Sequence, residues 1–212
     1  MTNKDKLAMI VAEFMGTAIL VMVVYSMVAR TTFPLFAALG AGATLALLSV
    51  TMGWANGGVH LNPAVTVSLW TQNRTETFAA IVAIAAQFLG AFAACALLGY
   101  FLGRDLQSTA GRFDWKILTA EAIGAGVFIF GVAAAAYHQS LSKTAAAVVA
   151  GSSLFLGIMV ASIGSAAVIN PAVAVGIQSW NWAYAAGPVI GGIVGVSLYG
   201  LLFAPTPAKR KK

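Results

Sequence analysis

The chain has 212 residues, of which 8% are charged and 60% are hydrophobic, and its formal net charge is +6. An ordinary soluble domain carries about 25% charged residues, so this composition excludes a soluble enzyme with a charged surface, and also a disordered chain. The single cysteine, Cys95, excludes a disulfide framework and a cysteine-rich metal site. Four cations gather in the C-terminal tail, at Lys209, Arg210, Lys211 and Lys212. Membrane lipid is therefore a better partner for the positive charge than nucleic acid.

Six stretches are long and apolar enough to cross a bilayer, which takes about 20 mostly apolar residues per helix. They cover about residues 7–29, 35–55, 78–102, 116–137, 144–163 and 183–204. The first stretch carries Glu13 and lacks a convincing cleavage site after it, so we interpret it as a retained helix rather than a signal peptide. The composition and these spans predict a polytopic helical membrane protein.

Two further apolar segments, at about 62–71 and 170–179, are too short to cross, and each begins with Asn-Pro. Asparagine is a favoured N-cap, and proline fits the first helical position because its missing N–H would have no partner there. Each segment therefore predicts a half-helix that starts inside the membrane. Backbone that is not helical at that depth is tolerated only where it is buried in protein or faces water, so two half-helices predict a cavity.

The bias in lysine and arginine predicts that both termini are cytoplasmic. In that orientation the inner side holds eight positive residues and the outer side holds four. The inner eight are the tail cations with Lys4, Lys6, Arg74 and Lys143, and the outer four are Arg30, Arg104, Arg112 and Lys116. An aromatic belt is expected at the outer interface, from Trp115, Trp180, Trp182 and Tyr184.

Two motif pairs recur at one spacing, which indicates an internal repeat. Glu13 in 12–21 matches Glu121 in 120–129, and Asn62 matches Asn170, with an offset of 108 residues in both cases. Each half then holds three spans and one half-helix. Because three is odd, the second half runs through the membrane inverted relative to the first, with the half-helix N-termini facing a site at the midplane.

The motifs Asn62-Pro63-Ala64 and Asn170-Pro171-Ala172, with Gly57-Gly58-Val59-His60-Leu61 before the first, resemble those of the aquaporin (major intrinsic protein) family. The similarity extends from Glu13 to Gly195. It implies an all-α membrane protein with six transmembrane helices plus two re-entrant half-helices in an inverted 3+3 repeat. It also implies one pore per subunit and a homotetramer, which we expect in the cell membrane.

With this resemblance, residues 1–212 are expected to form a single membrane channel domain. Repeat one covers about 7–102, repeat two about 116–204, and the basic tail 205–212. The sequence contains no recognisable nucleophile–base pair, metal cluster or phosphate-binding loop. We therefore predict no enzyme activity, no catalytic residues, no metal and no cofactor.

Asn62 and Asn170 have two interpretations. In the first, both side-chain amides donate N–H groups to a solute at the pore centre, and the positive half-helix ends repel cations and orient a central water. Such an arrangement would interrupt a proton-conducting chain of waters. In the second, the asparagines are only N-caps. We favour the pore role because capping alone does not explain the repeat.

Glu13 and Glu121 each lie about six residues inside a helix, or roughly 9 Å along its axis, where a carboxylate needs a partner. They could bind solute, or they could accept hydrogen bonds from the re-entrant loop of their own half, which the resemblance favours. His60 could gate the pore by titrating near neutrality, although bracing the loop or lining the inner vestibule is preferred. The position that matches His60 is Val168, so no histidine pair is available for a metal.

The outer constriction departs from the family pattern. In water-selective relatives an Arg directly follows the second Asn-Pro-Ala motif, but here that position is Val173. Gapless alignment on the motifs gives Gly42, Ile158 and Ala167 as the other constriction residues, and a small shift would bring Leu45 to the place of Gly42. All are small or apolar, so we expect a filter that is wider and drier than a water-only filter and lacks a fixed cation.

The main hypothesis is a passive channel for water and small uncharged solutes such as glycerol, urea or dissolved gases. A closed or structural homologue with a hydrophobic plug at the constriction is the alternative. A secondary transporter is less favoured, because Glu13 and Glu121 look structural and no ion-coupling cluster is evident. Gly187, Gly191 and Gly195 predict a close-approach face for a neighbouring helix, in the same chain or in another subunit.

Overall fold

The computed structural model describes residues 2–53, 58–109, 111–138 and 140–205. The tail cations, the end of the second predicted span at 54–55 and Gly57 of the first motif lie outside these residues. Within the described ranges the chain forms eight helices and no strand. The prediction of an all-α protein is confirmed.

Six of the described helices are long and apolar enough to cross a membrane. They are α1 (Asn3–Val28), α2 (Pro34–Met52), α4 (Thr77–Leu102), α5 (Trp115–Tyr137), α6 (Lys143–Ala161) and α8 (Trp182–Leu202). These helices match the six predicted spans, with ends displaced by a few residues. The start of α1 lies earlier than predicted because Thr2 and Asp5 cap it reciprocally, each side chain accepting a hydrogen bond from the other's backbone N–H.

The two short helices are α3 (Pro63–Thr71) and α7 (Pro171–Gly176). Each begins at the proline of an Asn-Pro-Ala motif, and the preceding asparagine is the N-cap with an extended backbone. Helix α7 stops short of the predicted end at 179. Its continuation is blocked by Gln178, which has a φ of 60° and therefore a left-handed conformation that a helix does not accept.

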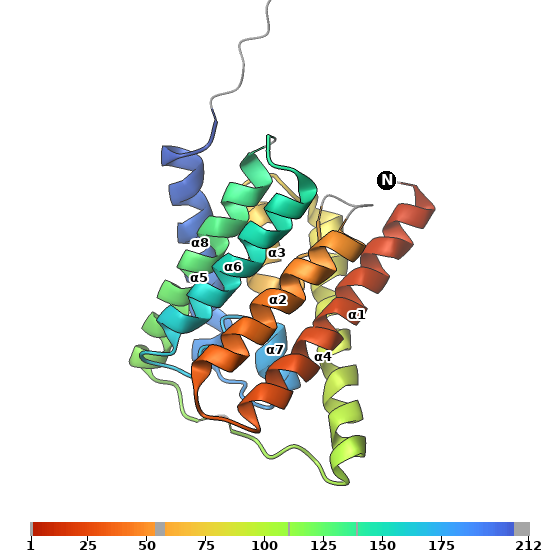
Figure 1. Cartoon of the computed structure of the whole chain (residues 1–212), viewed down its shortest axis with the longest axis vertical. Coiled ribbons are helices and arrows are strands. Elements are labelled where there is room, and N and C mark those ends of the chain that lie inside the picture. The colour runs from red at the N-terminus through yellow and green to blue at the C-terminus, as the bar shows by residue number, and fades with distance from the viewer. Residues whose placement is uncertain (1, 54–57, 110, 139, 206–212) are drawn as a thin grey trace, which may run out of the picture.

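The two halves of the chain run in opposite directions, as Figure 1 shows. Helix α1 descends from the N-terminus while α5, the first helix of the second half, ascends. Each half-helix packs mainly against a long helix of the other half, α3 against α8 and α7 against α4. Among the long helices, α5 packs mainly against α8 and α6, α1 packs mainly against α4, and α2 packs mainly against α6. This interlocking brings the N-termini of α3 and α7 together inside the bundle.

Small residues allow α8 to lie close to α5. A Cβ atom on Gly187 would lie 2.8 Å from the carbonyl oxygen of Leu118 and 2.9 Å from the Cβ of Glu121. Gly191 faces the Ala122 backbone in the same way. The helix that the glycine face contacts is therefore α5 of the same chain, which resolves the alternative left open by the sequence.

We expect Gly187→Ala to destabilise the bundle, because the added methyl group meets backbone atoms that cannot move aside. Overpacking of this kind costs about 1–3 kcal/mol. The matched control is Gly99→Ala on α4, where the nearest atom to the new Cβ is the Arg104 carbonyl oxygen at 3.6 Å, an ordinary contact. Thermal unfolding in detergent should give a lower transition temperature for Gly187→Ala alone. Equal transition temperatures for the two variants would contradict this packing.

Candidate functional site

The two half-helices meet at Asn62 and Asn170. The side-chain Nδ2 of Asn62 donates a hydrogen bond to the carbonyl oxygen of Ile169 at 2.9 Å, and that of Asn170 donates to the carbonyl oxygen of Leu61 at 2.8 Å. Each Oδ1 accepts from the backbone N–H two residues further on, at 2.8 Å and 3.0 Å respectively. Each amide nitrogen carries two hydrogens. Capping uses only the oxygen and the cross-contact uses one hydrogen, so each asparagine keeps one free N–H.

Leu61 and Ile169, the residues that precede the asparagines, share an uncommon backbone conformation. Their φ angles are 52° and 42°, in the left-handed region that bulky and β-branched residues rarely adopt. Both residues are completely buried. Strain of this kind persists where surrounding contacts fix the backbone, and here the carbonyl of each strained residue accepts the hydrogen bond from the opposite asparagine.

Glu13 holds the first re-entrant loop. Its Oε1 accepts a hydrogen bond from the His60 N–H at 2.7 Å, and its Oε2 accepts from the Leu61 N–H at 2.8 Å. The side chain of Gln87, from α4, donates a third hydrogen bond to Oε2 at 2.7 Å. Loop N–H groups at membrane depth have no water to bond with, so the carboxylate supplies the acceptors that the loop lacks.

Glu121 does the same for the second loop. It accepts hydrogen bonds from the backbone N–H groups of Val168 at 3.0 Å and Ile169 at 2.6 Å. The third donor is the Ser165 hydroxyl, at 2.6 Å. His60 and Leu61 correspond to Val168 and Ile169 at the repeat offset, so both carboxylates hold equivalent backbone positions. This geometry favours the bracing interpretation over solute binding.

A polar network surrounds the first loop and has no equivalent in the second. Gln87 also donates to the Thr66 hydroxyl at 3.0 Å, and that hydroxyl lies 3.0 Å from Nδ1 of His60. At the matching positions the second half has Gly195, Ala174 and Val168. His60 is thus held through both its backbone and its ring, and it also lines a cavity of about 330 Å³. An isolated glutamine inside an apolar span is the signal that could have identified Gln87 from sequence.

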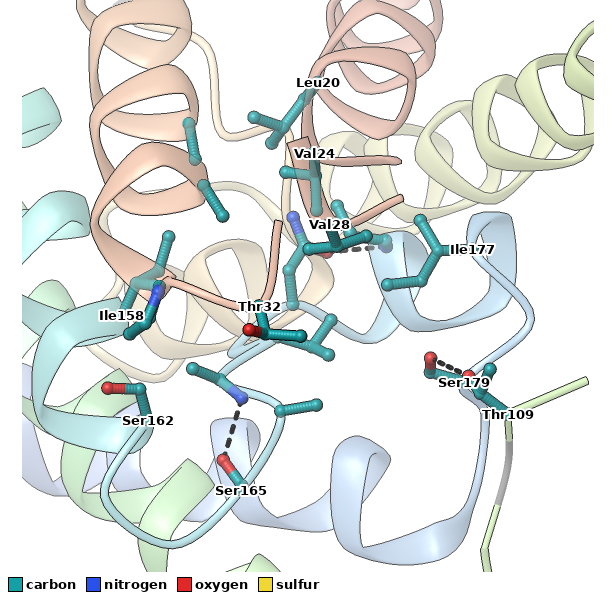
Figure 2. A pocket seen from close by; sticks show the side chains of 18 of the residues that line it. Leu20, Val24, Val28, Thr32, Thr109, Ile158, Ser162, Ser165, Ile177 and Ser179 are labelled. Carbon is teal, nitrogen blue, oxygen red and sulfur yellow. Dashed lines mark hydrogen bonds between the residues drawn. The ribbon is translucent and has the colours of Figure 1, made fainter. Parts of the chain in front are cut away.

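A cavity of about 500 Å³ lies between α1, α6 and the loop before α7 (Figure 2). Leu20, Val24 and Val28 of α1 line one wall, and Ile158 of α6 and Ser162, the C-cap residue of that helix, lie across from them. The re-entrant loop before α7, with α7 itself, closes the inner end, where Ala167, Asn170 and Val173 contribute to the lining. Among the described residues, no charged side chain lines this cavity. Three of the four predicted constriction residues therefore share one cavity.

The prediction of Gly42 as the fourth constriction residue is wrong. Gly42 lies where α2 crosses α6, and a Cβ atom there would be 2.6 Å from the carbonyl oxygen of Gly151. The alternative, Leu45, is packed in the hydrophobic core and is not among the cavity-lining residues. Ala41 lines the cavity instead. Because successive residues on a helix are rotated by about 100°, the contact of Gly42 with α6 turns Ala41 toward the cavity.

Tyr184 differs in burial from the other residues of the predicted aromatic belt. Trp115 and Trp182 are largely exposed, but Tyr184 is only 6% exposed. Its hydroxyl oxygen accepts a hydrogen bond from the Ala166 N–H at 3.2 Å. Tyr184 therefore stabilises the second re-entrant loop, a role that hydropathy alone does not reveal.

Thr109, from the loop between α4 and α5, attaches that loop to the segment after α7, beside the 500 Å³ cavity. Its N–H donates to the Gln178 carbonyl at 2.8 Å, and its hydroxyl lies 2.6 Å from the hydroxyl of Ser179 (Figure 2). Thr109 also lines the cavity. The sequence carried no motif that pointed to this residue.

Helices long enough to cross a membrane surround two half-helices, whose N-termini meet beside a cavity. This arrangement is that of a membrane channel. The family model described as "Major intrinsic protein" matches residues 1–199. The chain is 31% identical to aquaporin TIP1-1 of Zea mays over 180 residues, which are 80% of this chain and 72% of that protein. It is 28% identical to aquaporin-1 of Homo sapiens over 221 residues, covering 92% of this chain and 82% of that protein.

The fold is similar to that of the aquaglyceroporin from Plasmodium falciparum, with a TM-score of 0.76 and 17% identity over 93% of this chain and 96% of that chain. The chain belongs to the major intrinsic protein family, the aquaporins. It is an integral, multi-pass membrane channel for water and small solutes, and not an enzyme.

We expect Glu121→Gln to lower both stability and channel flux. The amide retains one acceptor oxygen but presents an NH2 group where a loop N–H needs an acceptor, and each unmade buried hydrogen bond costs about 1–3 kcal/mol. Thermal unfolding in detergent and water flux in vesicles measure the two effects. Glu76→Gln is the control, because Glu76 is exposed and makes no side-chain capping bond. The bracing role is disproved if both variants unfold and conduct like the parent protein.

Proposed function

We propose that the channel passes uncharged solutes larger than water, through an outer constriction formed by Ala41, Ile158, Ala167 and Val173. The observation that carries this proposal is the chemistry of these four side chains, which are aliphatic and contribute to one uncharged cavity. The small side chains of Ala41 and Ala167 leave room for a solute, and none of the four residues supplies a fixed cation. A pore without that charge has a weaker electrostatic barrier to protons and cations.

The two motifs Asn62-Pro63-Ala64 and Asn170-Pro171-Ala172 are proposed to form the pore centre. Support comes from the amide groups, because each asparagine keeps one N–H beyond its cross-contact. Those two N–H groups would hold a passing molecule by its oxygen and so orient the waters on either side. Glu13, Glu121 and His60 are proposed to brace the loops that carry the motifs.

Residues 1–212 are proposed to form one channel domain with one pore per chain, assembled as a homotetramer in the cell membrane. Both termini are assigned to the cytoplasmic side because Lys4, Lys6, Arg74 and Lys143, with the tail, outnumber the outer cations. The tetramer rests on family resemblance. Native mass spectrometry from detergent should detect four copies, and a monomer under conditions that retain flux would contradict it.

Val173→Arg tests the constriction directly. The arginine would narrow the filter and add a positive charge, so we expect glycerol flux to fall by at least about tenfold, equivalent to ~1.4 kcal/mol of barrier. Proton leakage should fall as well, while water flux is reduced less. Stopped-flow light scattering of reconstituted vesicles measures water and glycerol, and an internal pH dye measures protons.

Two results would count against the proposal. An unchanged flux profile in Val173→Arg would mean that Val173 does not lie at the filter. Low water flux in the parent protein that rises when Val173 becomes polar would indicate a closed homologue, in which the apolar ring excludes water by dewetting. Absence of flux for water and for every neutral solute would remove the open-channel function altogether.

A further inference from the structure

The outer constriction presents no free hydrogen-bond donor to a passing solute. In the loop before α7, the backbone N–H groups of residues 166–169 are used inside the protein. Ala166 donates to Tyr184, Ala167 donates to the Ser165 hydroxyl, and both Val168 and Ile169 donate to Glu121. The N–H of Val173 donates to Asn170 at 3.3 Å. A solute at the level of Val173 therefore meets no backbone N–H from this loop.

The hydroxyl groups around the cavity are occupied in the same way. The Ser162 hydroxyl donates to the Met159 carbonyl at 2.7 Å, and the Ser165 hydroxyl donates to Glu121. The Ser179 hydroxyl lies 2.6 Å from the Thr109 hydroxyl and can donate to it, while the Thr109 hydroxyl donates to the Gln178 carbonyl at 3.4 Å. The remaining hydroxyls of the lining, Thr31 and Thr32, belong to the loop between α1 and α2 at the mouth (Figure 2 labels Thr32). Donors are thus confined to the mouth and to the asparagine amide at the inner end.

Acceptors, in contrast, are available at the constriction. Ala166, Ala167 and Val168 line the cavity, and within the described part of the chain no group donates a hydrogen bond to their carbonyl oxygens. A buried carbonyl needs a donor, and a permeating molecule with an O–H or N–H group would supply one. The rest of the ring consists of the aliphatic groups of Ala41, Ile158 and Val173. A solute can therefore donate hydrogen bonds here but cannot receive them.

We propose that this channel selects small neutral solutes that carry few hydroxyl or carbonyl oxygens, and that it discriminates against polyols of the same size. Every solute oxygen that enters the ring loses the water that was donating to it, and the protein offers no replacement. Unmade hydrogen bonds of this kind raise the barrier with each added oxygen. The inference rests on the proposed function, since it assigns the substrate class of that same constriction.

The test uses 1,3-propanediol and glycerol, which share a three-carbon chain and differ by one hydroxyl. Uptake into reconstituted vesicles is measured by light scattering, and the uptake of protein-free vesicles is subtracted. The channel-mediated permeability should be about tenfold higher for the diol than for glycerol, since one unmade hydrogen bond is worth about this factor. Equal permeabilities, or a preference for glycerol, would overturn the inference.

Two pairs of variants separate hydrogen bonding from aperture size. Val173→Asn and Val173→Leu give side chains with the same branching and the same number of heavy atoms, one more than valine has, but only the asparagine adds N–H donors. The diol-to-glycerol ratio should fall several-fold in Val173→Asn and stay near the parent value in Val173→Leu. Ile158→Gln and Ile158→Met form a second matched pair. The diol-to-glycerol ratio should again fall only in the variant that adds N–H donors, Ile158→Gln. The inference fails if the ratio changes equally within each pair, because size alone would then set selectivity.

Water flux, measured in the same vesicles, separates this inference from the proposed function. Normal flux of water and diol with a preference for glycerol would overturn only the substrate class. No flux of water or of either solute above protein-free vesicles would overturn both. Water flux in each variant also shows that the variant is folded and inserted.

Discussion

The fold depends on one constraint, which is that backbone interrupted inside a membrane must find hydrogen-bond partners within the protein. Glu13 and Glu121 meet this need by accepting hydrogen bonds from consecutive N–H groups in the two re-entrant loops. A buried carboxylate is itself unfavourable without donors. The loops and the acids therefore stabilise each other, and neither could stay at this depth alone.

The two halves meet this constraint with different surroundings. The first half adds the side chains of Gln87 and Thr66, which extend the polar network to His60. The second half has Gly195 and Ala174 at those positions, so α8 packs more closely on α5, and Ser165 supplies the extra hydrogen bond. The two halves are alike at the asparagines and the glutamates. They differ in the side chains that surround each loop.

Much of this arrangement could be predicted from the sequence, because it depends on patterns that are local in the chain. The spans follow from runs of apolar residues, and the half-helices follow from Asn-Pro and their short length. Ala41 could not be identified in the same way, since the rotation of α2 depends on its contact with α6 at Gly42 and Gly151. Tyr184 was missed for a related reason. Its burial depends on a loop that comes before α8 in the sequence but folds against it.

The contact between the two asparagines also constrains how the protein is made. The amide of Asn62 bonds to a carbonyl 107 residues further along the chain, whereas Glu13 lies within 48 residues of the loop that it braces. At a synthesis rate of about 5–20 residues per second, the first motif waits on the order of 5–20 s for its partner to leave the ribosome. During that interval the Asn62 amide lacks its native acceptor, and the pore axis is completed only when the second half has been inserted.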